Sequence, residues 1–173
     1  MNKKFNDLYE IIRILRAPGG CPWDMEQTHQ SIRQNFIEET YEAVEAIDLG
    51  DRTLLCEELG DVLMQAVFHT QIEEELGGFS MEDVTTGVVQ KLIYRHPHVF
   101  ADTVADTSEE VLVNWEKLKA KEKHRDTVTA TLESVPKPLP ALMRAEKVGK
   151  KAAKVGFDFA TPEDAAKKIY EET

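Results

Sequence analysis

Two pairs of acidic residues carry the clearest chemical signal in the sequence. Glu39 and Glu42 stand three residues apart, and Glu58 and Asp61 repeat that spacing after an interruption at residues 50–51. Residues three apart are neighbours on the surface of a helix, so each pair presents two carboxylates from one face. If the two helices form an antiparallel hairpin, the four carboxylates converge on one site.

Such a convergence of negative charge is unfavourable without a cation. Two like charges ~4 Å apart cost about 4 kcal/mol at an effective dielectric constant of 20, so four acids either take up protons or bind a metal ion. Carboxylate ligands without His or Cys favour a hard ion, Mg²⁺, with Mn²⁺ as a substitute. The alternative is two solvated acidic faces, which is the ordinary reason for Glu on a helix.

The elements expected to hold these acids are two amphipathic helices, over about residues 27–49 and 52–76. Each acid pair lies roughly 100° from the centre of the apolar stripe of its helix. This matched placement at the edge of a buried seam favours the metal site over two solvated faces. The stripes comprise Ile32, Phe36, Ala43 and Ile47 in the first helix, and Leu55, Leu59, Val62 and Ala66 in the second.

The remaining predicted elements are also helices, so the expected fold class is all-α. Apolar spacing, capping residues and glycine stops predict further helices over about residues 4–16, 80–96, 108–123, 139–155 and from 162 onwards. No segment shows the alternation typical of a strand. Pro136, Pro138 and Pro140 indicate a linker or an extended arm before the last two helices.

The overall composition excludes several classes of protein. The chain has 173 residues, and no apolar run approaches the ~20 residues that a membrane-spanning helix needs. Its net charge of −11 argues against a nucleic-acid polymer as partner, because such binding requires a basic footprint. Cys21 and Cys56 form no C-x-x-C pair, which favours a reduced, cytoplasmic protein.

At the acidic residues the chain resembles the MazG family of nucleoside triphosphate pyrophosphohydrolases. The family motif, E-E-x-x-E followed by E-x-x-D, stands here at residues 38–42 and 58–61. The resemblance includes Gly-Cys-Pro-Trp-Asp at residues 20–24 and Arg-His-Pro-His-Val-Phe at residues 95–100. It covers most of the chain, from about Leu15 to Phe159.

The resemblance implies hydrolysis of a nucleoside triphosphate to a monophosphate and pyrophosphate. It implies a helical bundle whose four-helix core is completed by homodimerisation. We expect Glu39, Glu42, Glu58 and Asp61 to bind Mg²⁺. Glu38 lies ~100° from Glu39 around the helix, and we expect it to orient the attacking water as a general base or to bind a further ion.

Four further residues are expected to contact the nucleotide. Lys91 and Arg95 stand four residues apart on a predicted helix, and the resemblance implies that they bind the triphosphate. Trp115 and Lys119 have the same spacing, and the resemblance suggests nucleotide contact there too. From the residues alone, a solvated basic pair and a Trp115 that anchors the core remain alternatives.

We expect three parts in the chain: a MazG-like domain over residues 1–125, a proline-containing linker over 126–140, and a helical extension over 141–173. The end of the extension, Tyr-Glu-Glu-Thr at 170–173, echoes Ile-Glu-Glu-Thr at 37–40. Because many family members carry two tandem domains, the extension is interpreted as the start of a truncated second MazG-like domain.

Two other functions compete with this prediction. One is a catalytically weak nucleotide-binding or dimerisation module of a tandem-domain protein that contacts a partner protein. Leu54 and Leu55 support it, because the resemblance implies a Lys near this position in active domains. The other is a di-iron bundle, which requires Glu-x-x-His on two helices. Here Glu42 and Asp61 occupy the histidine places.

Overall fold

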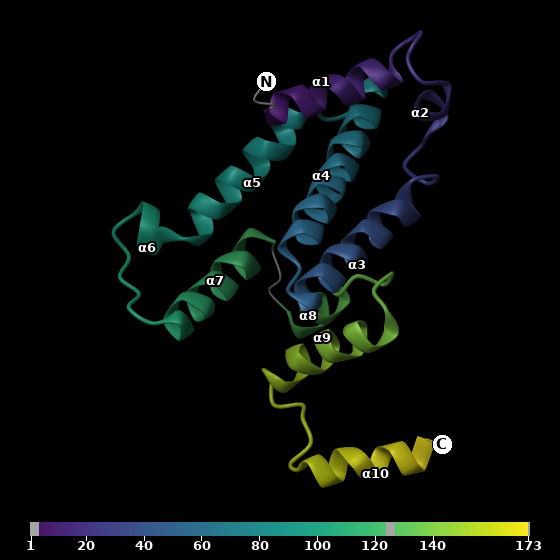
Figure 1. Cartoon of the computed structure of the whole chain (residues 1–173). Helices are drawn as coiled ribbons and strands as arrows, with labels where there is room; N and C mark the ends of the chain where they lie inside the picture. Colours follow the sequence, from purple (N-terminus) through teal and green to yellow (C-terminus); the bar gives the residue numbers. More distant parts are fainter. Residues whose placement is uncertain (1–3, 124–126, 173) are drawn as a thin grey trace. The chain divides into compact units, whose positions relative to one another are not determined.

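The computed structural model describes residues 4–123 and 127–172, and all regular secondary structure in that part is α-helical (Figure 1). The helices are α1 (Phe5–Arg16), α2 (Pro22–Glu26), α3 (Arg33–Leu49), α4 (Arg52–Glu75), α5 (Met81–Arg95), α6 (Pro97–Phe100), α7 (Ser108–Glu122), α8 (Val128–Glu133), α9 (Ala141–Ala153) and α10 (Pro162–Glu172). This confirms the predicted all-α class. None of the described helices combines the length and apolar character that crossing a membrane requires.

The described residues form two compact units, one up to Lys91 and one from Leu92. In the first unit, α3 and α4 lie side by side as an antiparallel hairpin (Figure 1). Gly50 ends α3 in the left-handed region at a φ of 67°, where glycine is favoured. Asp51 accepts hydrogen bonds from the backbone N–H groups of Thr53 and Leu54 at 2.9 and 3.1 Å. Gly50 and Asp51 therefore form the turn between the two helices.

The core of the first unit lies where α1 packs against the C-terminal half of α4. Its buried members are Ile12, Ile32, Val67, Phe68 and Ile72. Arg16, which is buried at the end of α1, pairs with Glu75 at the end of α4 at 2.6 Å. These contacts fix the C-terminal end of α4. The other end of α4, which carries the acidic residues, packs against α3.

The start of α3 differs from the prediction by six residues, at Arg33 instead of residue 27. Thr28 and Ser31 explain the difference. The Ser31 hydroxyl accepts from the Thr28 backbone N–H at 2.9 Å, and the Thr28 hydroxyl accepts from the Ser31 backbone N–H at 3.2 Å. Such local side-chain bonds compete with the helical ladder, so they keep this segment as a turn.

The predicted apolar stripes are partly wrong. Ile32 and Ala43 are buried, but Ile47 is 60% exposed and Leu59 is 53% exposed. Alanines are the buried apolar residues of α3, since Ala46 accompanies Ala43. Six large apolar side chains of the hairpin are exposed, here called the exposed hairpin residues: Ile37, Tyr41, Val44, Ile47, Leu59 and Leu63.

The second unit contains the end of α5 and the helices α6 to α10. Within it Arg95 is buried and pairs with Glu122 of α7 at 2.8 Å. The segment expected as a linker contains α8, which packs against α9. The expected domain boundary at residues 125–126 lies outside the described residues, so the three-part division stays a prediction. Thr173, the last residue of the segment that resembles residues 37–40, also lies outside them.

Candidate metal centre

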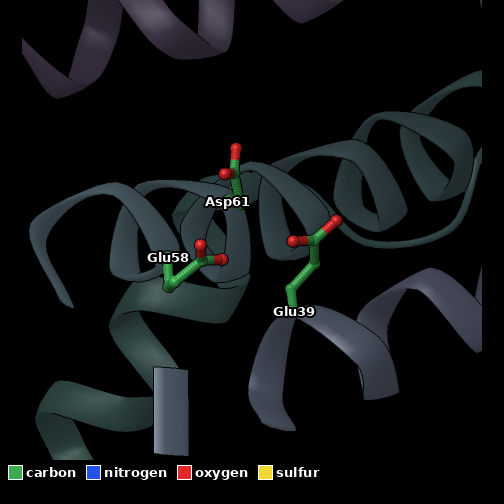
Figure 2. A group of neighbouring side chains, drawn as sticks. All are labelled: Glu39, Glu58 and Asp61. Carbon is green, nitrogen blue, oxygen red and sulfur yellow. The ribbon is translucent and has the colours of Figure 1, made fainter. Parts of the chain in front are cut away.

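Three carboxyl groups meet where α3 and α4 face each other. Glu39 of α3 and Glu58 and Asp61 of α4 offer oxygens that all lie within 4.8 Å of one another. Figure 2 shows the Glu39 and Glu58 side chains extending toward each other from the two helices, with Asp61 beside them. The hairpin turn at residues 50–51 sets this register, so the spacing read in the sequence becomes a cluster in space.

The electrostatics of this cluster oppose full ionisation. Burial raises the pKa of Glu39, and the charges of Asp61 and Glu42 raise it further. Burial likewise raises the pKa of Glu58, followed by the charges of Glu42 and Asp61. Because each acid disfavours the charge of its neighbours, binding of protons or of a cation would reduce the repulsion within the group.

The other two acids of the motif lie outside this group of three. Glu42 is exposed, yet it lies near enough for its charge to raise the pKa values of Glu39 and Glu58. Glu38 is exposed and accepts a hydrogen bond from the Gln34 amide at 2.9 Å. The structure thus gathers three of the four predicted ligands and places Glu42 beside them.

Gln65 also belongs to the site, and the sequence analysis missed it. Its side chain is buried on α4 and hydrogen-bonds Glu39. Gln65 follows Asp61 by four residues and Glu58 by seven, so all three share one face of the helix. A polar residue continuing the acidic stripe was the signal in the sequence that could have found it.

The predicted nucleotide-binding residues occupy contrasting environments. Lys91 is exposed, whereas Arg95 is buried in its ion pair with Glu122. The Arg95 guanidinium lies 5.2 Å from the centre of the Trp115 ring, and the Lys119 ammonium lies 4.3 Å from it. In the second unit, Arg95, Trp115 and Lys119 therefore form one cluster around an indole.

A histidine pair in the first unit was also missed by the sequence analysis. His29 and His69 are 40 residues apart, yet their Nδ1 atoms lie 2.8 Å from each other. His29 Nε2 lies 2.9 Å from Glu73. Only the packing of the turn before α3 on α4 creates this contact, so the spacing of the histidines in the sequence contains no signal for it.

The ligand set of the acidic cluster suits a hard cation. In the part of the chain that the structure describes, the group of three consists of carboxylates without an imidazole. Oxygen ligands of this kind are those that Mg²⁺ and Mn²⁺ prefer. A di-iron bundle needs His three residues after the Glu ligands, whereas Glu42 and Asp61 stand three residues after Glu39 and Glu58.

Comparisons with known proteins identify the family of the chain. The family model of the MazG nucleotide pyrophosphohydrolase domain matches residues 27–100. The nucleoside triphosphate pyrophosphohydrolase of Escherichia coli K12 is 46% identical over 166 residues, covering 95% of this chain and 63% of that protein. The nucleoside triphosphate pyrophosphohydrolase/pyrophosphatase MazG of Thermotoga maritima is 45% identical over 168 residues, covering 97% of this chain and 64% of that protein.

Another relative, the uncharacterized protein YabN of Bacillus subtilis, is 50% identical over 147 residues, which are 85% of this chain and 30% of that protein. The chain therefore spans less than two thirds of the length of these three curated relatives. A crystal structure of a MazG-related protein from Thermotoga maritima matches with a TM-score of 0.56 and 30% identity, over 66% of this chain and 97% of that one. The residues that the family model matches include both acidic segments, and the chain belongs to the MazG nucleotide pyrophosphohydrolase family.

Proposed function

We propose that this chain hydrolyses nucleoside triphosphates to a nucleoside monophosphate and pyrophosphate, with Mg²⁺ held by Glu39, Glu58 and Asp61. The observation that carries the proposal is the meeting of these three carboxyl groups within 4.8 Å between two helices. The names of the Escherichia coli and Thermotoga maritima relatives support the reaction class. Cleavage between the α and β phosphates follows from membership of the family.

Each acid has a distinct part in the proposed reaction. Glu39, Glu58 and Asp61 would hold Mg²⁺, which would supply neutralisation of the phosphate charge and a lower pKa for water at the site. Glu42, beside the group of three, completes the ligand set. Glu38 uses one oxygen for the Gln34 amide and keeps the other for the attacking water, whose proton it accepts.

The triphosphate is an anion and the chain has a net charge of −11, so local cations must offset the repulsion. We propose that Lys91, Arg95 and Lys119 do so, with Trp115 beside the nucleoside. An indole with two cations near its ring suits a base joined to phosphates. Trp115→Leu and Lys91→Ala are expected to raise the KM more than they lower kcat.

A second copy of the chain is proposed to cover the exposed hairpin residues. These six large apolar side chains of α3 and α4 are exposed, so the helices packed against the hairpin in the described part of the chain do not bury them. The resulting four-helix core is the one that family membership implies. The same exposed side chains favour the alternative function, a dimerisation module with weak nucleotide binding, because dimerisation alone would explain their exposure.

A substrate panel with Mg²⁺ separates the two functions. Mixed ribonucleoside and deoxyribonucleoside triphosphates are incubated with the protein, and the products are resolved by chromatography. The proposal predicts monophosphate and pyrophosphate, with at least a 100-fold loss in Glu58→Gln and a clear loss in Glu42→Ala. If the wild-type protein releases no more pyrophosphate than Glu58→Gln does, hydrolysis is rejected and the dimerisation module remains.

A further inference from the structure

We propose that Gln65 is a positioning residue, whose buried amide holds the Glu39 carboxylate in place opposite Glu58 and Asp61. The inference rests on the proposed function, because it concerns the ligands of the proposed metal ion. It adds a residue outside the acidic motif to the machinery of the site.

The geometry of α4 is the first support. Glu58, Asp61 and Gln65 follow one another at spacings of three and four residues, so they form one stripe of the helix. Glu58 and Gln65 are both buried in that stripe, at 8% and 6% exposed. Glu39 reaches the stripe from α3. One of its carboxyl oxygens lies within 4.8 Å of an oxygen of each of the two acids, and its carboxyl group hydrogen-bonds the Gln65 side chain.

The chemistry of the amide fixes the direction of the hydrogen bond. An ionised carboxylate can only accept, so Gln65 must donate from Nε2 to Glu39. A metal ion also binds the ionised form of a carboxylate. A neutral donor at position 65 is therefore compatible with the form of Glu39 that the proposed ion needs.

A neutral donor suits this position better than a cation. A Lys or Arg at position 65 would pair with the acids permanently and compete with a divalent ion for the same carboxylates. An amide orients one ligand and adds no net charge, as outer hydrogen-bond partners do at other metal sites. Gln65 thus supplies orientation and leaves the negative charge available.

Gln71 offers a matched control on the same helix. It is 7% exposed, close to the value for Gln65, and its amide donates to Glu75 at 3.3 Å, outside the acidic cluster. Gln71→Met therefore removes a buried amide without touching the site. Gln65→Met makes the same chemical change beside Glu39.

Mn²⁺ titration followed by electron paramagnetic resonance tests the inference without relying on turnover. We expect Gln65→Met to weaken Mn²⁺ binding by about 10–100-fold, and Gln71→Met to leave it unchanged. The Mg²⁺ concentration for half-maximal pyrophosphate release should rise by the same factor. Gln65→Asn is the second variant, used if Gln65→Met fails to fold. It keeps a polar side chain but shortens its reach by one methylene, so it should also weaken Mn²⁺ binding.

The outcomes distinguish this inference from the proposed function. If wild type binds Mn²⁺ and releases pyrophosphate while a folded Gln65 variant has wild-type affinity, the role of Gln65 is overturned and the proposed function stands. If wild type neither binds Mn²⁺ nor releases pyrophosphate, both are overturned. Equal weakening by Gln71→Met would show general damage to α4 and would also reject the role of Gln65.

Discussion

Glu58 is 8% exposed on α4, and its carboxyl group lies with that of Glu39 from α3 in a group spanning less than 4.8 Å. The charge of Glu39 is one of the causes that raise the pKa of Glu58. The folded chain thus brings together acids that the unfolded chain keeps apart. Because this repulsion destabilises the folded state at neutral pH, cations that bind the acids should stabilise the protein.

The first prediction is that Glu58→Gln stabilises the metal-free protein. The raised pKa values of Glu39 and Glu58 mean that the folded state binds protons more tightly, so stability falls as pH rises above the ordinary carboxyl range. At pH 7.5 in a chelator, removal of one charge should raise the Tm by a few degrees. Thermal unfolding measures it, with Glu45→Gln, an exposed acid of α3, as control. A Tm below that of wild type would contradict the prediction.

The second prediction concerns the response of wild type to Mg²⁺. A ligand at 100 times its Kd stabilises the folded state by about 2.7 kcal/mol, which corresponds to roughly 5–10 °C for a chain of this size. Glu58→Gln should show little of this rise, because it removes a proposed ligand. Scans with and without Mg²⁺ at constant ionic strength measure the difference. An equal rise in both proteins would indicate a non-specific salt effect.

The sequence could predict the parts of this site that depend on residues close together in the chain. The helical period and the short turn at residues 50–51 predict that the acids converge, because both are local. Gln65 and the pair of His29 and His69 depend on which faces of packed helices meet, and the sequence pattern does not determine that. The exposed Ile47 shows the same limit, since an apolar residue at helical spacing does not say which surface will cover it.

The third prediction is a loss of stability on acidification through the histidine pair. When Glu73 accepts from His29 Nε2, neutral His29 accepts at Nδ1, and His69 donates. One added proton preserves this chain of hydrogen bonds, whereas a second makes both Nδ1 atoms donors and breaks their bond. Burial and the charge of His29 accordingly lower the pKa of His69.

Because the folded state lowers this pKa, the stabilisation is complete above the ordinary value of about 6.5 and is lost as pH falls below it. Unfolding measured from pH 8 to 5 should therefore show a steeper decline in wild type than in His69→Asn. His96→Asn, a change at the histidine that precedes α6, should decline as wild type does. Imidazole NMR signals of His69 titrating at or above 6.5 would refute the prediction.

The last prediction contrasts two ion pairs of α1 that differ in burial. The Arg16 side chain is 4% exposed where it pairs with Glu75, whereas Arg13 and Glu10 are about half exposed. Glu75→Gln leaves a buried guanidinium without its charged partner, and should cost about 2–3 kcal/mol in the free energy of unfolding. Glu10→Gln should cost less than about 1 kcal/mol, because water screens the exposed pair.

Urea denaturation measures both changes in one experiment. The Arg16 pair joins the end of α1 to the end of α4, where the core of the first unit lies. A large loss in Glu75→Gln alone would mean that this junction supports the long helix on which Glu58 and Asp61 stand. Equal losses in the two variants would mean that burial of Arg16 does not set the strength of the contact. The position of α4 would then depend on its apolar packing alone.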